Sequence, residues 1–224
     1  MRSFLRHNSL SLFFGLIFQL SLVGQSVAGW QQFNAHQVSA HLDTITWMSY
    51  VASSDFVVDV AENWQSEFLQ FWLYLTATVW LLQKGSSESK ELDKAGRESD
   101  KDQKIGAYAE EDSPAWAKTE DWRTRVYSSS LAIVMGLIFL ASWLVQSVAG
   151  WAAFNEERLQ SLQDPLGWGQ YLGNADFWSR TLQNWQSEFL AVGSMAVFAI
   201  YLRQRGSPES KPVGEPHDST GIEG

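Results

Sequence analysis

Two carboxylates with identical sequence surroundings are the first residues of this chain that could do chemistry. Glu67 and Glu188 each lie in the hexapeptide Trp-Gln-Ser-Glu-Phe-Leu, and Asn63 or Asn184 directly precedes it. A carboxylate at the edge of an apolar segment is costly to bury, so the pair is a candidate for binding a cation or proton or for lining a polar cavity. The structural alternative is a first-turn carboxylate that the helix dipole stabilises, or an interfacial residue paired with a nearby Gln or Asn.

Two glutamines occupy matched places in other apolar segments. Gln25 and Gln146 each open the sequence Gln-Ser-Val-Ala-Gly-Trp. Their amides could hydrogen bond across helices, to each other or to the Glu or Asn of a neighbouring helix, and so hold helices together. A ligand contact is the sharper alternative for both residues.

Other kinds of chemistry find no support in the sequence. The histidines His7, His36, His41 and His217 lack metal-ligand spacing on a shared element, and the chain has no Cys. We therefore predict no metal site, no cofactor and no thiol chemistry. A phosphate-binding glycine loop and a Ser/His/Asp arrangement are also missing, so the sequence does not predict an enzyme. A net charge of −9 argues against nucleic acid as a partner.

Four apolar blocks must position these polar residues. They cover residues 10–28, 66–82, 129–149 and 187–202, and each is roughly long enough for a helix to cross a hydrocarbon core. Lipid offers backbone groups no hydrogen-bond partners, so the blocks should be helical. Ser53 or Ser54 and Asn174 are the expected N-caps of longer helices that contain the second and fourth blocks.

The two halves of the chain repeat one another. Ser9–Lys90 aligns with Ser130–Lys211 without a gap at a constant offset of 121, and 34 of 82 positions are identical. The fold class predicted is therefore an all-α membrane protein with four transmembrane helices, built as two tandem two-helix repeats. Because each repeat has an even number of spans, a pseudo-two-fold axis along the membrane normal should relate them. A cleaved signal peptide would also explain the first block, but the internal copy of Ser-Val-Ala-Gly at Ser147–Gly150 argues against it.

The domain organisation follows from the repeat. We expect repeat 1 at residues 1–83, a charged linker at 84–127, repeat 2 at 128–205 and a tail at 206–224. The linker is rich in charged residues and Ser, and the tail in Pro and Gly, so both should be mostly disordered.

The distribution of basic residues predicts the orientation. Of the 16 Lys and Arg residues, only Arg158 and Arg180 fall in the two loops that follow the first and third spans. The other 14 lie on one side of a four-span protein, and that side should be cytoplasmic. The prediction is a multi-pass protein of the bacterial inner membrane with both termini in the cytoplasm.

Tryptophan is unusually common, with 12 residues, and four of them flank the predicted spans on the outer side: Trp30, Trp64, Trp151 and Trp185. Such positions are typical of the aromatic belt at a membrane interface. A sugar-binding or lipid-binding surface formed with the loop aromatics is the alternative.

The motifs Gln-x-x-x-Gly-Trp and Asn-Trp-x-Ser-Glu-Phe-Leu-Gln resemble those of an uncharacterised family of bacterial membrane proteins, a domain of unknown function. The resemblance covers nearly the whole chain, and repeat 2 departs from it at Ala191, where repeat 1 has Gln70. It implies a four-span membrane protein and no particular activity.

The function expected is structural, as a scaffold or accessory subunit in the lipid bilayer, with a homo-oligomer or another membrane protein as the partner. The competing interpretation is a small oligomeric transporter or channel for ions, protons or small molecules that uses Glu67 and Glu188. A shared polar cavity between the two carboxylates would favour transport. Exposed carboxylates, or carboxylates paired with Arg180 or nearby amides, would favour the scaffold.

Overall fold

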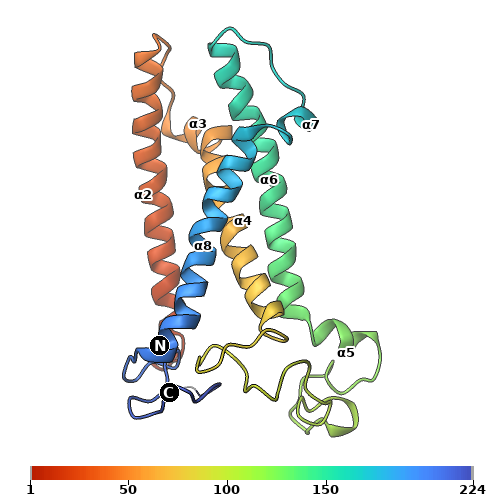
Figure 1. Ribbon diagram of the computed structural model, residues 1–224. Coiled ribbons are helices and arrows are strands. Elements are labelled where there is room, and N and C mark those ends of the chain that lie inside the picture. The colour runs from red at the N-terminus through yellow and green to blue at the C-terminus, as the bar shows by residue number, and fades with distance from the viewer. Residues whose placement is uncertain (1, 223–224) are drawn as a thin grey trace. The chain divides into compact units, whose positions relative to one another are not determined.

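The computed structural model describes residues 2–222, and every regular element among them is a helix (Figure 1). The elements are α1 (Arg2–His7), α2 (Ser9–Ser39), α3 (Trp47–Val51), α4 (Ser54–Ala77), η1 (Gly106–Tyr108), α5 (Trp122–Tyr127), α6 (Ser130–Gln160), α7 (Trp168–Tyr171) and α8 (Ala175–Tyr201). The described part of the chain contains no strand, so the protein is all-helical, with four long helices joined by short elements and loops.

Two of the long helices, α2 and α6, are long and apolar enough to cross a membrane. Both continue well past the predicted apolar blocks, by about three turns at their C-terminal ends. Helix α4 ends at Ala77, before the expected end of its block at residue 82. Beyond Ala77 the chain continues as turns, in which the Leu81 N–H donates to the Ala77 carbonyl at 2.8 Å.

The starts of α4 and α8 confirm the predicted N-caps. The Asn174 side chain accepts a hydrogen bond from the backbone N–H of Asp176 at 2.9 Å. Ser53 immediately precedes α4, and its hydroxyl accepts from the backbone N–H of Phe56 at 3.4 Å. Each cap satisfies a donor of the first helical turn that has no partner within the helix.

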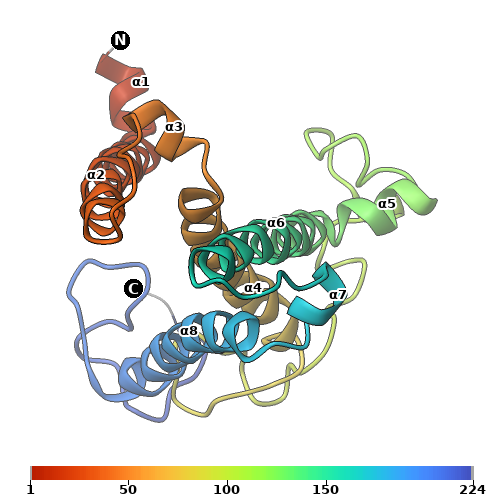
Figure 2. The ribbon, with the colours of Figure 1, turned by 90° about the horizontal axis from the view of Figure 1, so that it is seen from above.

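The chain divides into two compact units, and each draws on both halves of the sequence. Unit 1 consists of Met1–Ala61 and Val145–Leu172, and unit 2 of Glu62–Leu144 and Gly173–Gly224. In unit 1, α3 lies beside α2 (Figure 2). The boundary therefore passes through α4 and α6, and the two sequence repeats do not coincide with the two units.

In unit 1 a Trp and an Asn one turn apart hold the loop that follows each apolar helix. Trp30 Nε1 donates to the Ile45 carbonyl at 2.7 Å. The Asn34 amide donates to the same carbonyl at 3.0 Å and accepts from the Ile45 N–H at 2.9 Å. The same three bonds recur at Trp151, Asn155 and Leu166, at 2.7, 2.9 and 2.8 Å. The matched sequence motifs thus form matched local structure.

A buried tyrosine packs directly on a glycine of each apolar helix in unit 1. Tyr50 lies on Gly29 and Tyr171 on Gly150, and the two rings are 3% and 1% exposed. A methyl group on Gly29 would overlap the Tyr50 hydroxyl, and one on Gly150 would lie 2.6 Å from Tyr171 Oη. Glycine is required at these positions because any side chain would displace a buried ring.

Helices α2 and α6 end in the same unusual way. The N–H of Leu42 donates to the Gln37 carbonyl, and the N–H of Gln163 to the Arg158 carbonyl, both at 2.8 Å. This is the Schellman pattern, in which the residue before the donor takes a left-handed conformation that is usually left to glycine. Here those residues are His41 and Leu162, with φ of 60° and 57°.

In unit 2 an aromatic ladder joins three of the long helices. Trp72 of α4 stacks on Phe139 of α6 with ring centroids 6.4 Å apart, and Phe139 stacks on Trp143 at 5.6 Å. Trp143 in turn contacts Phe177 and Trp185 of α8 at 6.2 and 5.8 Å. Large rings in such contacts contribute packing beyond the area they bury.

Matched turns follow α4 and α8. We call Gln83–Lys90 and Gln204–Lys211 the exit turns. The Ser89 hydroxyl accepts from the Gln83 N–H and the Ser210 hydroxyl from the Gln204 N–H, both at 2.9 Å. Gly85 and Gly206 both have φ of 85°, a conformation that glycine adopts without steric cost.

The last residue of the second exit turn, Lys211, is 1% exposed. Its ammonium donates to the carbonyl of Gly85 in the first exit turn at 2.7 Å. Three carbonyls of the chain end complete the ring: Pro216 at 3.1 Å, His217 at 3.0 Å and Ser219 at 3.0 Å. The matched Lys90 is more exposed, donates to the Gly96 carbonyl at 2.8 Å and pairs with Glu98.

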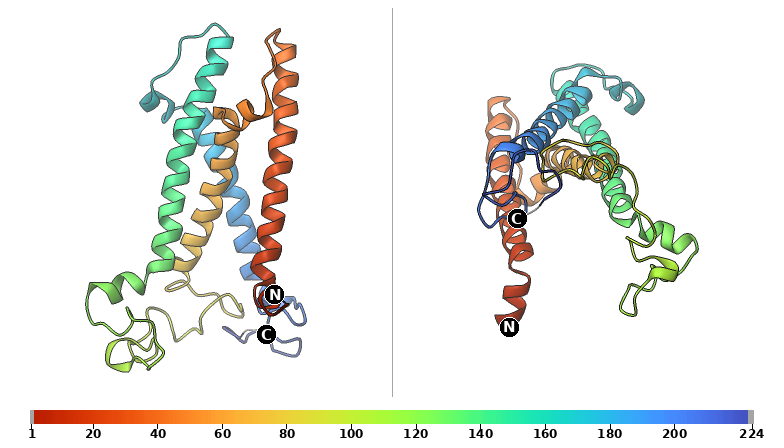
Figure 3. Two further views of the ribbon diagram at one scale, coloured as in Figure 1. Left: turned by 180° about the vertical axis from the view of Figure 1, so that it is seen from behind. Right: turned by 60° about the horizontal axis from the view of Figure 1, so that its bottom comes forward.

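The chain end bonds to the first exit turn as well. The Gly85 N–H donates to the Thr220 hydroxyl at 2.8 Å, and the Gly221 N–H to the Ser86 carbonyl at 3.0 Å. Figure 3 shows the C-terminal segment folded back at the end of α8. Lys211 therefore joins both exit turns and the chain end in one hydrogen-bonded group within unit 2.

We predict that Gly29→Ala and Gly150→Ala each destabilise the protein, by about 1–3 kcal/mol, because the added methyl group overpacks a buried tyrosine. Gly24→Ala is the matched control, since a methyl group there meets no other atom. It should leave the protein unchanged or raise its stability by up to about 1 kcal/mol, through helix propensity. Thermal unfolding in detergent micelles measures all three, and equal effects would contradict the packing assigned to Gly29 and Gly150.

We predict that Lys211→Met releases the chain end. Loss of the charged donor should lower the free energy of docking by about 2–3 kcal/mol, which corresponds to roughly a hundredfold faster cleavage of the His217–Asp218 bond by a protease that cuts on the N-terminal side of aspartate. Lys90→Met is the control, because its partly exposed ion pair should be worth less than about 1 kcal/mol. Equally rapid cleavage of the unsubstituted protein and both variants would show that the chain end is free in solution.

Candidate functional site: polar residues of α4 and α8

The shared motif Asn-Trp-Gln-Ser-Glu-Phe-Leu buries different residues in its two copies. On α4, Gln65 and Ser66 are 0% and 2% exposed. On α8, the matched Gln186 and Ser187 are exposed, and it is Trp185 that is half-buried. Identical sequences thus present different faces to the interior of unit 2.

One direct side-chain bond links the two motif copies. Trp185 Nε1 donates to Gln65 Oε1 at 2.8 Å. The ring of Trp143 covers Trp185 at 5.8 Å, so the bond lies in apolar surroundings. A satisfied hydrogen bond of this kind contributes about 1 kcal/mol, and removing one partner from a buried pair costs more.

An ion pair links the same helices nearer to their N-terminal ends. Arg180 Nη1 lies 3.2 Å from Glu62 Oε2, and Arg180 Nε lies 3.4 Å from Asp176 Oδ2 on the same helix. Repeat 1 has Asp59 where repeat 2 has Arg180, and repeat 2 has Gln183 where repeat 1 has Glu62. The pair therefore depends on positions at which the repeats differ, and a search for shared residues could not find it.

The two carboxylates predicted from the sequence lie in unlike surroundings. Glu67 is exposed and Glu188 is half-buried, and each lies within range of the other's charge. Of the neighbouring asparagines, Asn63 is exposed, whereas Asn184 donates from Nδ2 to the Arg180 carbonyl at 3.1 Å. The Asn184 amide therefore bonds to a backbone carbonyl one turn earlier in its own helix.

The remaining predicted residues are dispersed. Gln25 is exposed and Gln146 is 1% exposed, so the matched glutamines do not share an environment. Trp30 and Trp151 each hold their own loop in unit 1, as described above. Trp64 is 41% exposed. Among the predicted residues, Glu188 of α8 lies within range of the charge of Glu67 of α4.

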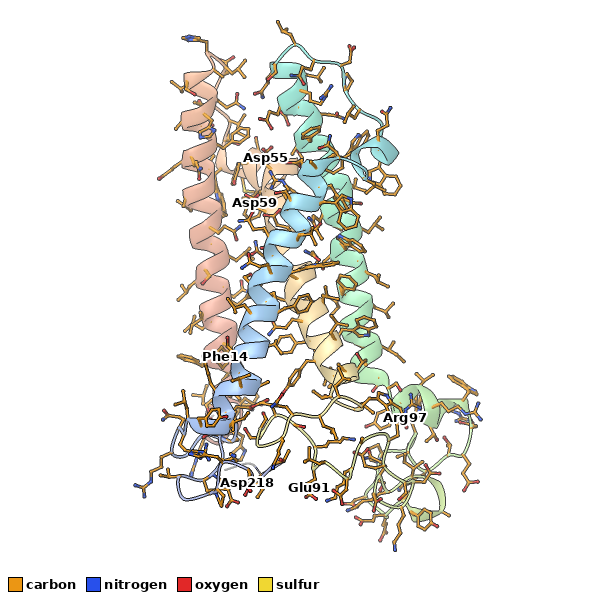
Figure 4. All side chains as sticks on the ribbon, viewed as in Figure 1. Phe14, Asp55, Asp59, Glu91, Arg97 and Asp218 are labelled. Carbon is orange, nitrogen blue, oxygen red and sulfur yellow. The ribbon has the colours of Figure 1, made fainter. Side chains whose placement is uncertain are left out.

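Acidic groups gather near the start of α4 in unit 1, where Figure 4 labels Asp55 and Asp59. Burial raises the pKa of Tyr50, and the charges of Asp59 and Asp55 raise it further. Partial burial and the charge of Asp55 raise the pKa of Glu156, while a hydrogen bond with Ser54 opposes the shift. No group of three or more His, Asp or Glu residues in the described part of the chain could hold a metal ion.

Comparison with known proteins identifies one family. The model of a family described as Domain of unknown function (DUF6766) matches residues 1–222. No curated protein and no solved structure matches the chain.

We predict that Glu62 and Arg180 are energetically coupled. Glu62→Gln and Arg180→Gln should each lower the melting temperature, and the double variant should lose less than the sum, with a coupling of about 0.5–1 kcal/mol for this partly exposed pair. Thermal unfolding at low and high salt measures the cycle. Gln183→Ala, at the position of α8 that matches Glu62, is the control for a surface change on the same helix. Additive effects of the two substitutions would show that the pair contributes nothing.

Proposed function

Because the chain belongs to this family, whose description assigns no activity, we propose its function from the distribution of its polar and apolar residues. We propose an integral membrane protein with four membrane-crossing helices whose role is structural, as a scaffold or accessory subunit for other membrane components.

The observation that carries the proposal is the inverted surface of α6. Leu137, Leu140 and Leu144 are 61%, 56% and 56% exposed, whereas Ser142, Gln146 and Ser147 on the same helix are buried. A soluble protein buries its leucines and exposes its serines, and a continuous apolar surface of this kind marks a lipid or partner interface. Since α6 lies in the middle of the chain, it is not a removable leader.

Helix α2 has the same character over most of its circumference. Phe13, Phe14, Leu16 and Leu20 are all exposed, and Figure 4 labels Phe14. A helix satisfies its own backbone hydrogen bonds, so it can lie in hydrocarbon without loss, and each apolar side chain then avoids the cost of contact with water.

The step from two spans to four is supported by length and charge. Helix α8 has 27 residues, about 40 Å at the usual helical rise, which exceeds a hydrocarbon core of about 30 Å. Helix α4 has 24 residues, about 36 Å, of which residues 66–77 belong to the predicted apolar span. With four crossings, 14 of the 16 basic residues fall on one side, the pattern typical of a cytoplasmic face. Both termini and the linker then lie in the cytoplasm.

A structural role is favoured over transport because two pairs of polar side chains connect α4 to α8. Gln65 Oε1 accepts from Trp185 Nε1 and Glu62 pairs with Arg180, so these atoms hold the helices together, while Gln65 Nε2 is buried without a hydrogen-bond partner among the described residues. The observation that favours a transporter is the proximity of Glu67 to Glu188, since like charges at a membrane edge attract a cation or proton. Glu67 is exposed, which supports the scaffold.

The topology can be tested with single cysteines, because the natural chain has none. We predict that a membrane-impermeant maleimide labels Thr44→Cys and Gln163→Cys in intact spheroplasts, labels Ser99→Cys only after permeabilisation, and does not label Leu137→Cys. A protein with only two spans, α2 and α6, would instead place Ser99 outside and Gln163 inside. Labelling of Leu137→Cys would show that this position of α6 is in contact with water, which would contradict the membrane protein altogether.

A flux measurement in liposomes distinguishes the scaffold from the transporter. Liposomes with the purified protein should show no more ion or proton flux than protein-free liposomes. Flux that is present in the natural protein and absent in Glu67→Gln/Glu188→Gln would overturn the structural role in favour of transport.

A further inference from the structure

The segment that leads into α6 carries an aromatic face on its outside. Trp116, Trp122, Val126 and Tyr127 are 41%, 61%, 40% and 44% exposed, and we call these four residues the aromatic face. Trp116 and Trp122 contact each other edge to face at 5.9 Å. We propose that the aromatic face binds the headgroup layer of the cytoplasmic leaflet and that the basic residues beside it select anionic lipids. This inference rests on the proposed topology.

The interior of the same segment is polar, which is the reverse of a water-soluble helix. Thr124 is 7% exposed, and its hydroxyl bonds to the Trp116 carbonyl at 2.8 Å and to the Thr119 hydroxyl at 2.9 Å. On α5 the positions of Trp122 and Val126 lie one turn apart, and Thr124 lies between them on the opposite side. An amphipathic aromatic side chain that points outward from such a helix is typical of membrane interfaces.

The segment is attached closely to the membrane helix. The N–H of Ser128 donates to the Thr124 carbonyl at 2.8 Å, and the Ser130 hydroxyl, in the first turn of α6, donates to the Tyr127 carbonyl at 2.8 Å. Figures 1, 2 and 3 show α5 turned away from the line of α6. An element that leaves the end of a membrane helix sideways lies at headgroup depth, next to the exposed leucines Leu131 and Leu137 of α6.

Basic side chains border the aromatic face. Residues 114–127 contain three basic residues, Lys118, Arg123 and Arg125, against two acidic ones, Glu120 and Asp121, and three further acidic residues, Glu110, Glu111 and Asp112, precede them. Asp121 accepts from the backbone N–H of Arg123 at 2.9 Å and pairs with its Nε at 3.1 Å, while Glu120 and Arg125 line one cavity of about 860 Å³. The three basic side chains are exposed, so they can reach lipid phosphates.

The test uses the full chain in nanodiscs of pure phosphatidylcholine or of phosphatidylcholine with phosphatidylglycerol. Single variants Val126→Cys, Ser99→Cys and Leu137→Cys carry an environment-sensitive fluorophore, and acrylamide, which is uncharged and so is not repelled by anionic lipid, is the aqueous quencher. We expect the labels at Val126→Cys and Leu137→Cys to be protected and the label at Ser99→Cys to be quenched. Protection at Val126→Cys should increase with phosphatidylglycerol.

A second variant separates charge from insertion. Arg123→Gln/Arg125→Gln should remove the effect of phosphatidylglycerol and lower the amount of this lipid retained on purification, by about fivefold for each charge removed. When Arg123→Gln/Arg125→Gln is combined with Val126→Cys, the label at position 126 should stay protected in phosphatidylcholine. Protection without any dependence on lipid charge would overturn the selection of anionic lipids.

The outcomes also distinguish the two proposals. A quenched label at Val126→Cys beside a protected label at Leu137→Cys would refute the lipid-binding face and leave the membrane protein intact. Quenching at both positions would refute the proposed function itself.

Discussion

The requirement that apolar side chains avoid water governs the rest of this structure. Leucines cover the outside of α2 and α6, while Ser26 of α2 and Ser142, Gln146 and Ser147 of α6 are buried. In water this arrangement would be unfavourable by the transfer cost of a large apolar area. In lipid it is favourable, and the interior is then free to hold polar residues that connect helices instead of a hydrophobic core.

Duplication and divergence have separate structural roles. The contacts that hold each loop to its own helix, such as those of Trp30 and Trp151, recur almost unchanged. The contacts between α4 and α8 depend on asymmetry, because Arg180 replaces an aspartate and Gln65 bonds to a tryptophan whose own copy is exposed. The contacts of each loop with its own helix are thus the same in both copies. The contacts between α4 and α8 use residues that differ between the copies in type or in exposure.

Sequence reasoning recovered what local patterns determine. It predicted helices in the four apolar regions and the cap at Asn174, and the helices of the first and third regions, α2 and α6, are long and apolar enough to cross a membrane. It missed the helix ends at His41 and Leu162, because a left-handed residue is normally recognised from glycine. It also missed the Glu62–Arg180 pair, which involves residues far apart in sequence and different in the two repeats.

The ring of carbonyls around Lys211 has a consequence for how the chain end can evolve. Every acceptor in it is a main-chain oxygen, so the ammonium of Lys211 depends on the backbone path of the chain end and bonds to none of its side chains. Substitutions in that stretch should be tolerated where the side chain makes no bond of its own, which excludes Thr220 and His217. Burial also shields this amine from acylating reagents that would reach Lys90, its counterpart in the first repeat.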